Sequence, residues 1–248
     1  MKTITLILGL MLSISTMAQK VNIAAAANLK YVLEEIKAQY IKEHPKTTLN
    51  ISFGSSGALV QQILNGAIFD FFMSADNEYT TKLKEKGATT GNIEVYATGK
   101  LVIYSTTIDV SKGLEILSNP GIKKIAIAKP EAAPYGDRAI EVLKRQGMMD
   151  LTKDKIVYAD NITQAAQFAY TGNAEIGFIA LSLAISPEMM AKGKYYVISP
   201  DQFTPIHQAC VRIKTSVLNT ETIKFMNYIL SPTIRPIWEK YGYSTPSK

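Results

Sequence analysis

Four short stretches of small and polar residues each follow an apolar segment and precede a stretch with helical periodicity. They are Ala27-Asn28, Ser55-Ser56, Pro134-Tyr135-Gly136 and Asp160-Asn161-Ile162. A helix that begins directly after a strand leaves its first backbone N–H groups without partners, and small residues let a ligand approach them closely. Helix starts bind small anions without any lysine or arginine, and these stretches contain neither. We therefore expect them to bind an anion together.

The expected ligand is a fully deprotonated tetrahedral oxyanion. Neutral donors and helix dipoles can satisfy all of its oxygens, and charge-assisted hydrogen bonds contribute about 1.5–3 kcal/mol each. Phosphate is partly protonated at neutral pH and would require a carboxylate acceptor. The one nearby carboxylate is Asp160, which we expect to cap the helix that follows it.

Each stretch alone is weak evidence, because Ser, Asn and Asp are common residues at helix starts. Asn28 is placed to cap a helix that runs to about Glu43, and Tyr135 is also compatible with a loop aromatic that packs on its neighbour. The order and spacing of the four stretches carry the prediction. In open α/β sheets, ligands collect beyond the carboxyl ends of the strands, where all four lie.

Apolar periodicity places these stretches in an alternation of strands and helices. Because no Asn-Gly hairpin signal separates the elements, the alternation predicts parallel α/β sheets. Pro236 falls inside the last expected helix and should kink it. The expected strands are 20–26, 48–53, 67–74, 100–105, 124–128, 155–158, 175–180, 194–199 and 208–213, and the expected helices are 29–43, 57–64, 77–86, 113–117, 137–145, 162–171, 220–230 and one from 232 onward.

The N-terminus has the pattern of a cleavable signal peptide. Lys2 precedes the apolar run 4–12, and Thr16 and Ala18 give the small-x-small pattern of a cleavage site. We expect cleavage after Ala18, which makes residues 1–18 the signal peptide; an uncleaved anchor is the alternative. No later segment offers the roughly 20 apolar residues of a membrane helix.

The single cysteine and the charge distribution indicate the compartment of the protein and the partners that it lacks. Cys210 lies far from the signal and within an apolar run, so we expect a buried inert thiol, no lipidation and no internal disulfide. Export without lipidation indicates the periplasm. The net charge of +6 comes from scattered lysines without a nucleic-acid-binding motif, and we expect no nucleic-acid partner.

Several motifs spread over the whole mature chain carry a family resemblance. They are AAANL (25–29), FGSSG (53–57), GAIFDFFMSAD (66–76), PEAAPYG (130–136), EIGFIA (175–180), LSP (230–232) and KYGY (240–243). Together they closely resemble the periplasmic molybdate-binding proteins of ABC transporters. The resemblance implies the type II periplasmic-binding fold, in which two α/β lobes with mixed sheets are joined by two crossover segments and close on the ligand. Residues 19–98 plus 206–248 would form lobe I, and residues 99–205 would form lobe II.

The resemblance also implies a ligand set. The side chain or backbone of Asn28, the hydroxyl of Ser56 and the backbone N–H groups of Tyr135 and Ile162 would hold the oxygens of molybdate or tungstate. These groups would touch the metal atom only through its oxygens, so no direct metal ligation is implied. Substitution of Tyr135 by phenylalanine should then be nearly silent.

Two further residues would line this site, and one family donor is missing. Ser55 adjoins Ser56, and Ala27 can offer only its backbone where some members carry a threonine ligand. A tyrosine hydroxyl found in some members falls on Ala180, so that donor is absent. The implied function is that of a monomeric receptor without a cofactor, which delivers molybdate or tungstate to an ABC permease in the inner membrane. Its hinge would lie near 96–100 and 200–208.

Three other functions compete with this interpretation. The first is a receptor for another anion such as sulfate, or for iron held by Tyr195-Tyr196, although that pair sits in a strand-like run. The second is a regulatory ligand-binding domain, which lacks a helix-turn-helix segment here. The third is a hydrolase that uses Ser55-Ser56, but the Gly-x-Ser-x-Gly elbow is absent and His44 and His207 have no companion residues.

Overall fold

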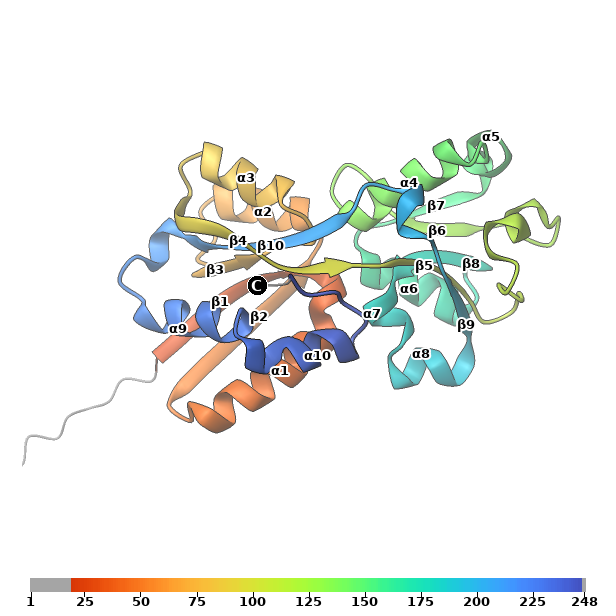
Figure 1. The fold of residues 1–248 in the computed structure, drawn as a ribbon. Coiled ribbons are helices and arrows are strands. Elements are labelled where there is room, and N and C mark those ends of the chain that lie inside the picture. Colours follow the sequence, from red (N-terminus) through yellow and green to blue (C-terminus); the bar gives the residue numbers. More distant parts are fainter. Residues whose placement is uncertain (1–18, 247–248) are drawn as a thin grey trace, which may run out of the picture.

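The computed structural model describes residues 19–246, so the predicted signal peptide at 1–18 lies outside the described residues. The described residues form two five-stranded sheets, one in each lobe (Figure 1). In order across the sheet, lobe I holds β2 (Thr47–Gly54), β1 (Gln19–Ala26), β3 (Phe71–Met73), β10 (Ile206–Ile213) and β4 (Thr89–Gly99). Lobe II holds β7 (Ile156–Ala159), β6 (Ile125–Ala128), β8 (Ile176–Ala180), β5 (Leu101–Ser105) and β9 (Lys194–Val197).

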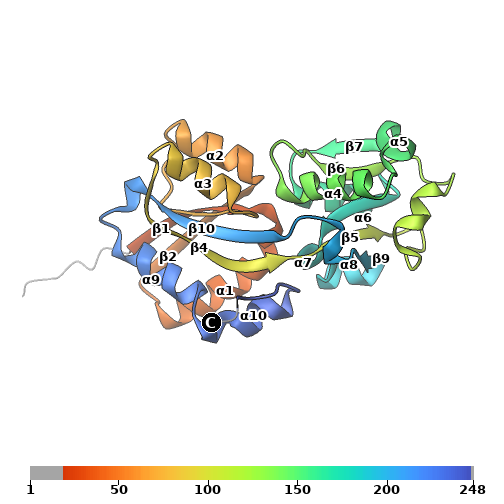
Figure 2. The same cartoon turned by 45° about the horizontal axis from the view of Figure 1, so that its top comes forward.

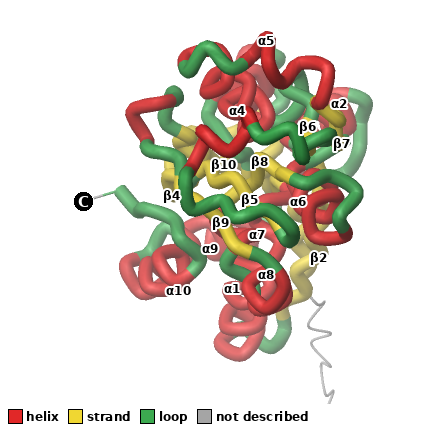
Figure 3. Tube along the Cα trace, turned by 90° about the vertical axis from the view of Figure 1, so that its right-hand side faces the viewer, coloured by secondary structure: helices red, strands yellow, loops and turns green. Residues whose placement is uncertain are grey.

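Helices cover both faces of the strands, as the side view in Figure 3 shows. Lobe I carries the 3₁₀ turn η1 (Ala27–Leu29), α1 (Lys30–Glu43), α2 (Ser56–Leu64), α3 (Glu78–Glu85), α9 (Thr220–Ile229) and α10 (Arg235–Lys240). Lobe II carries α4 (Pro134–Arg145), α5 (Met149–Thr152), α6 (Ile162–Thr171), α7 (Leu181–Ala184) and α8 (Pro187–Lys192).

Both sheets are mixed, which corrects the parallel arrangement expected from the alternation. β2, β1 and β3 run parallel, while β10 lies antiparallel to β3 and to β4. In lobe II, β7, β6 and β8 run parallel and β5 is antiparallel to β8 and β9. The antiparallel strands β4 and β10 extend from lobe I toward lobe II, so the chain crosses between the lobes at their ends (Figure 2).

The inner parallel strands, β1 and β3 in lobe I and β6 and β8 in lobe II, are largely buried on both faces, whereas β2 and β7 are partly exposed edge strands. In β1, Val21, Ile23 and the alanines that follow are 0–2% exposed, and in β6 the whole run 125–128 is inaccessible. Because β1, β2 and β3 run parallel, the loops that follow them lie at the same edge of the sheet. The loops after β1 and β2 hold two of the four stretches that the sequence singled out, and the other two stretches follow β6 and β7 in lobe II.

Three local predictions were wrong. The expected strand 67–74 is only β3 (71–73), and Ile68 lies on the surface as a 76% exposed residue, so the run is not buried throughout. The whole of β4 was missed, since its half-exposed, polar sequence has no apolar run until Tyr96. Pro236 does not kink a helix: it occupies the first turn of α10, where the missing N–H costs no hydrogen bond.

Candidate functional site

A small cavity lies between the two lobes, where η1, α2, α4 and α6 begin. Its wall includes all six residues that we expected to contact or line the oxyanion site, together with five others. The lining residues are Ala26, Ala27, Asn28, Gly54, Ser55, Ser56, Ala75, Ala133, Pro134, Tyr135 and Ile162. None of these residues is charged, so an anion in this cavity would be held by neutral hydrogen-bond donors.

Helix starts from both lobes supply backbone donors to the cavity. Ser56 is the first residue of α2, and Ile162 is the first residue of α6. Pro134 begins α4 and has no N–H of its own, so Tyr135 carries the first N–H of that helix. The first N–H groups of a helix have no partner inside it, and their partial positive charge favours an anion.

The cap of α6 differs from the prediction. Asn161, and not Asp160, caps the helix, because its Oδ1 accepts a hydrogen bond from the backbone N–H of Gln164 at 3.0 Å. Asp160 instead pairs with Lys129 at 2.7 Å on the surface. Both side chains are about half exposed or more, and neither lines the cavity. The carboxylate that we considered for a protonated ligand is therefore outside the site.

The side chain of Ser56 is held in place by the loop that follows β3. Its hydroxyl oxygen accepts a hydrogen bond from the backbone N–H of Ala75 at 3.0 Å, and the residue is 1% exposed. This contact fixes the rotamer while it leaves the hydroxyl proton free to be donated. Ser55 is the N-cap residue of α2, and its hydroxyl makes no capping hydrogen bond.

Asn28 does not act as the helix cap that the sequence predicted. It lies within η1, and its Nδ2 donates to Gln208 Oε1 at 2.9 Å and to the hydroxyl of Tyr243 at 2.8 Å. The carbonyl oxygen of Asn28 accepts a hydrogen bond from Ser182 Oγ of lobe II at 2.9 Å. Asn28 therefore joins the cavity wall to a buried polar layer behind it.

The hydroxyl of Tyr135 belongs to the same buried layer, which the sequence did not predict. It accepts a hydrogen bond from Gln208 Nε2 at 3.0 Å. Burial raises the pKa of Tyr135 well above its usual value, so the hydroxyl keeps its proton. Gln208, Tyr96 and Tyr243 are separated from the four loops by long stretches of sequence, and only the fold brings them beneath the cavity.

Several hydrogen bonds and one ion pair connect the lobes around the cavity. The N–H of Gly57 donates to Ala132 O at 2.9 Å, and the hydroxyl of Tyr79 donates to Glu131 O at 2.8 Å. Thr163 Oγ1 of α6 donates to the carbonyl oxygen of Ala27 at 3.0 Å. The lobes are thus in direct contact along the rim of the site.

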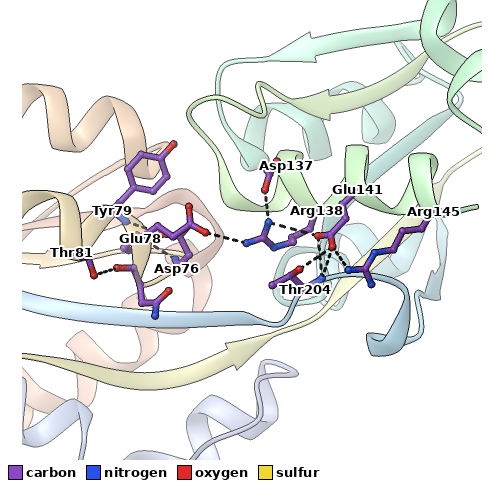
Figure 4. A network of polar contacts seen from close by, with 11 residues as sticks. Asp76, Glu78, Tyr79, Thr81, Asp137, Arg138, Glu141, Arg145 and Thr204 are labelled. Atoms are coloured by element: carbon purple, nitrogen blue, oxygen red, sulfur yellow. Dashed lines mark hydrogen bonds and ion pairs between the residues drawn. The ribbon is translucent and has the colours of Figure 1, made fainter.

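The ion pair joins Glu78 of α3 to Arg138 of α4 at 3.6 Å (Figure 4). Within lobe II the Arg138 guanidinium also contacts Asp137 and Glu141. Asp76, which follows cavity residue Ala75, is 5% exposed, and its Oδ1 accepts a hydrogen bond from Tyr79 N–H at 3.2 Å. Burial raises the pKa of Asp76 to about 6 from its usual value near 3.8.

The histidines and the tyrosine pair on which the competing interpretations depend lie outside the cavity wall. His44 stacks on Tyr40 at 4.3 Å, and His207 contacts Thr98, so neither lines the cavity. Tyr195-Tyr196 sits on the edge strand β9. Cys210 is fully buried, as predicted, and burial raises the pKa of its thiol. Ala180 ends β8 and also lies outside the cavity wall.

Among residues 19–246, no helix combines the length and the apolar composition that crossing a membrane requires. The same residues include no group of three or more His, Cys, Asp or Glu side chains that could hold a metal ion.

The family model of bacterial extracellular solute-binding proteins matches residues 21–244. This chain belongs to that family. Two solute-binding relatives are each named Molybdate-binding protein ModA. The one from Rhodobacter capsulatus is 36% identical over 246 residues, which cover 98% of this chain and 94% of that protein. The one from Azotobacter vinelandii is 34% identical over 235 residues, which cover 94% and 93%.

A solved solute-binding structure shares the fold closely. The periplasmic molybdate-binding protein of Azotobacter vinelandii superimposes with a TM-score of 0.86 and 31% sequence identity. The superposition covers 92% of this chain and all of the other chain. The match confirms the expected fold of two α/β lobes with mixed sheets.

Proposed function

We propose that this protein captures molybdate or tungstate between its lobes and delivers the anion to an ABC permease. The observation that carries the proposal is the uncharged cavity, which helix starts from both lobes surround. Its donors are the Ser56 hydroxyl and the N–H groups at the starts of α2, α4 and α6. Asn28, Ala27 and Ser55 also line the cavity.

Selection against phosphate follows from the same wall. Hydrogen phosphate must donate its own proton, and no carboxylate lines the cavity to receive it. An oxyanion without protons needs donors alone, which the helix starts supply. Selection against sulfate would come from the size of the closed cavity. Both named relatives and the solved structure are described as molybdate-binding, which supports the proposal.

The proposed receptor works by closure. Residues 19–98 plus 206–248 and residues 99–205 would move as two units about the crossovers near 96–100 and 200–208. The family description as extracellular supports export, and we place the mature protein in the periplasm as a monomer without a lipid anchor. It would act as a binding protein and not as an enzyme, with no cofactor and no nucleic-acid partner.

Isothermal titration calorimetry on the mature chain tests the proposed function. Molybdate and tungstate should bind with one site per chain, whereas phosphate should produce no binding heat and sulfate should bind more weakly. Equal or tighter binding of sulfate would identify a receptor for another oxyanion. If none of these anions bound, the proposal would be wrong.

A further inference from the structure

A pair of buried amides lies directly behind the cavity wall. Asn28 is 1% exposed and lines the cavity, and Gln208 on β10 is completely buried. Asn28 Nδ2 donates to Gln208 Oε1 at 2.9 Å, and Gln208 Nε2 donates to the Tyr135 hydroxyl at 3.0 Å. Gln208 therefore connects the first loop of lobe I to the start of α4 in lobe II.

Two features of this network are unfavourable with the nitrogen and oxygen atoms of the two amides in these positions. Asn28 Oδ1 is buried and has no hydrogen-bond partner among the described residues, and a buried acceptor without a donor costs about 1–3 kcal/mol. The Tyr96 hydroxyl faces two acceptors, Ser74 O at 2.8 Å and Gln208 Oε1 at 3.0 Å. It has one proton and can donate to only one of them.

A half-turn of both amides exchanges their nitrogen and oxygen atoms. It gives Asn28 Oδ1 a donor and leaves the Tyr96 hydroxyl a single acceptor, and the Asn28 nitrogen becomes the atom without a partner among the described residues. Gln208 Nε2 then donates to Asn28 Oδ1 with one proton and to the Tyr96 hydroxyl with the other. Tyr96 donates its own proton to Ser74 O. On the far side, the buried Tyr135 hydroxyl gains an acceptor, because Gln208 Oε1 now faces it.

The same half-turn changes what the cavity wall offers. Asn28 Oδ1 then accepts from Gln208 Nε2 and lies 2.8 Å from the Tyr243 hydroxyl oxygen. Tyr243 has one proton, which now faces Ser182 Oγ at 3.0 Å and Asn28 O at 3.1 Å, and it can turn to Oδ1 because Ser182 Oγ still donates to Asn28 O at 2.9 Å. Asn28 Nδ2 takes the position of the oxygen that has no partner. The first loop then presents a donor to the cavity where it would otherwise present an acceptor, and an acceptor repels an oxyanion.

We infer that Gln208 is a positioning residue that turns the Asn28 amide so that its nitrogen faces the bound oxyanion. The inference rests on the proposed function. Gln208 suits this role because one amide can donate to Asn28 and accept from Tyr135 at once. A carboxylate in its place could only accept, and an apolar side chain could do neither. Through Gln208, the orientation of the Asn28 amide in lobe I thus depends on the Tyr135 hydroxyl of lobe II, which Gln208 reaches when the lobes meet.

The first test compares Gln208→Met with Gln61→Met, which makes the same chemical change on the exposed face of α2. Calorimetry with molybdate should show at least a tenfold weaker binding for Gln208→Met, and binding within about twofold of wild type for Gln61→Met. If Gln208→Met bound molybdate as tightly as wild type, the inference about Gln208 would be wrong, and the proposed function would be unaffected. If the wild-type protein itself did not bind molybdate, the proposed function would fail, and this inference with it.

The second test needs no substitution, so it decides even if Gln208→Met does not fold. The side-chain amide signals of Asn28 and Gln208 are followed by ¹⁵N–¹H NMR in the ¹⁵N-labelled wild-type protein, with molybdate and then with tungstate. The Asn28 Nδ2 signals should shift on binding and should differ between the two anions, since they would touch the anion directly. Asn28 signals that are the same with and without anion would contradict the inference.

Discussion

The backbone N–H of Gly57 in lobe I donates a hydrogen bond to the carbonyl oxygen of Ala132 in lobe II at 2.9 Å. A Cβ atom added to Gly57 would lie 2.9 Å from Ala132 Cα and 3.0 Å from the hydroxyl of Tyr79. Gly57 adjoins Ser56, so one turn of α2 makes both an interlobe contact and a wall of the cavity. Closure and anion binding are thereby joined in neighbouring residues.

Gly57→Ala should weaken molybdate binding by at least tenfold, because the added methyl group keeps the lobes from meeting. Separated lobes leave room for the methyl group, so the unfolding temperature without ligand should change little. Calorimetry and thermal unfolding measure the two quantities. Gly121→Ala, on the surface of lobe II, is the matched control. A Gly57→Ala variant that bound as tightly as wild type would show that this contact is not part of the bound form.

Ser56→Ala should weaken molybdate binding by about 10- to 150-fold with the fold intact. The estimate corresponds to one charge-assisted hydrogen bond of about 1.5–3 kcal/mol. Ser55→Ala should have a smaller effect, because Ser56 is the serine whose hydroxyl is held by Ala75 N–H. Titration of both variants measures this difference. A larger loss in Ser55→Ala would exchange the roles of the two serines.

Glu78→Gln should change molybdate affinity by less than about fivefold. Glu78 pairs with Arg138 across the cleft, but its side chain is 75% exposed, and exposed ion pairs contribute about 0–1 kcal/mol. The small effect should shrink further at high ionic strength, because salt screens exposed charges. A loss beyond tenfold that persisted at about 1 M salt, where the screening length is only about 3 Å, would make this pair a principal lock of the closed form.

Asp76→Asn should flatten part of the pH dependence of stability. The unfolded chain releases the Asp76 proton near pH 3.8 and the folded protein only near pH 6. Since the folded state binds more protons between these values, the free energy of unfolding falls as the pH rises through them. The loss is about 3 kcal/mol at about 1.4 kcal/mol per tenfold change in proton affinity.

Chemical denaturation at pH 4 and pH 7 tests this prediction, with Asp137→Asn as the exposed control. The Asp76→Asn variant should gain stability relative to wild type at pH 7 and match it more closely at pH 4, since the amide oxygen of the new side chain can still accept from Tyr79 N–H. If this variant instead lost stability at pH 7, the charged carboxylate would be stabilising the fold.

The wall of the cavity could be predicted from the sequence because local rules govern it. Small residues between an apolar strand and an amphipathic helix mark a helix start wherever they occur, and Ser56 and Ile162 follow that rule. The buried polar layer behind the wall could not be predicted. Gln208 and Tyr243 reach Asn28 over 180 and 215 residues of chain, and no local pattern distinguishes a glutamine that packs beneath a site from one in any other strand.

The same limit explains why the helix cap predicted at Asn28 was wrong and why the hydrogen bond of the Tyr135 hydroxyl was missed. Both residues were interpreted from their immediate neighbours, Asn28 as a helix cap and Tyr135 as a backbone donor whose hydroxyl has no role; the backbone N–H of Tyr135 stays a prediction. In the structure each side chain is committed to a partner on β10. The prediction that Tyr135→Phe is nearly silent therefore changes: loss of the hydroxyl should weaken molybdate binding, because it removes the contact that orients Gln208.

A crystal structure of the mature protein with tungstate, phased on the tungsten anomalous signal, tests the central claim most directly. We predict one strong anomalous peak in the cavity, with the Ser56 hydroxyl and the N–H groups of Tyr135 and Ile162 at about 2.7–3.2 Å from the tungstate oxygens. A peak at any other place, or none when tungstate is in excess, would contradict the account.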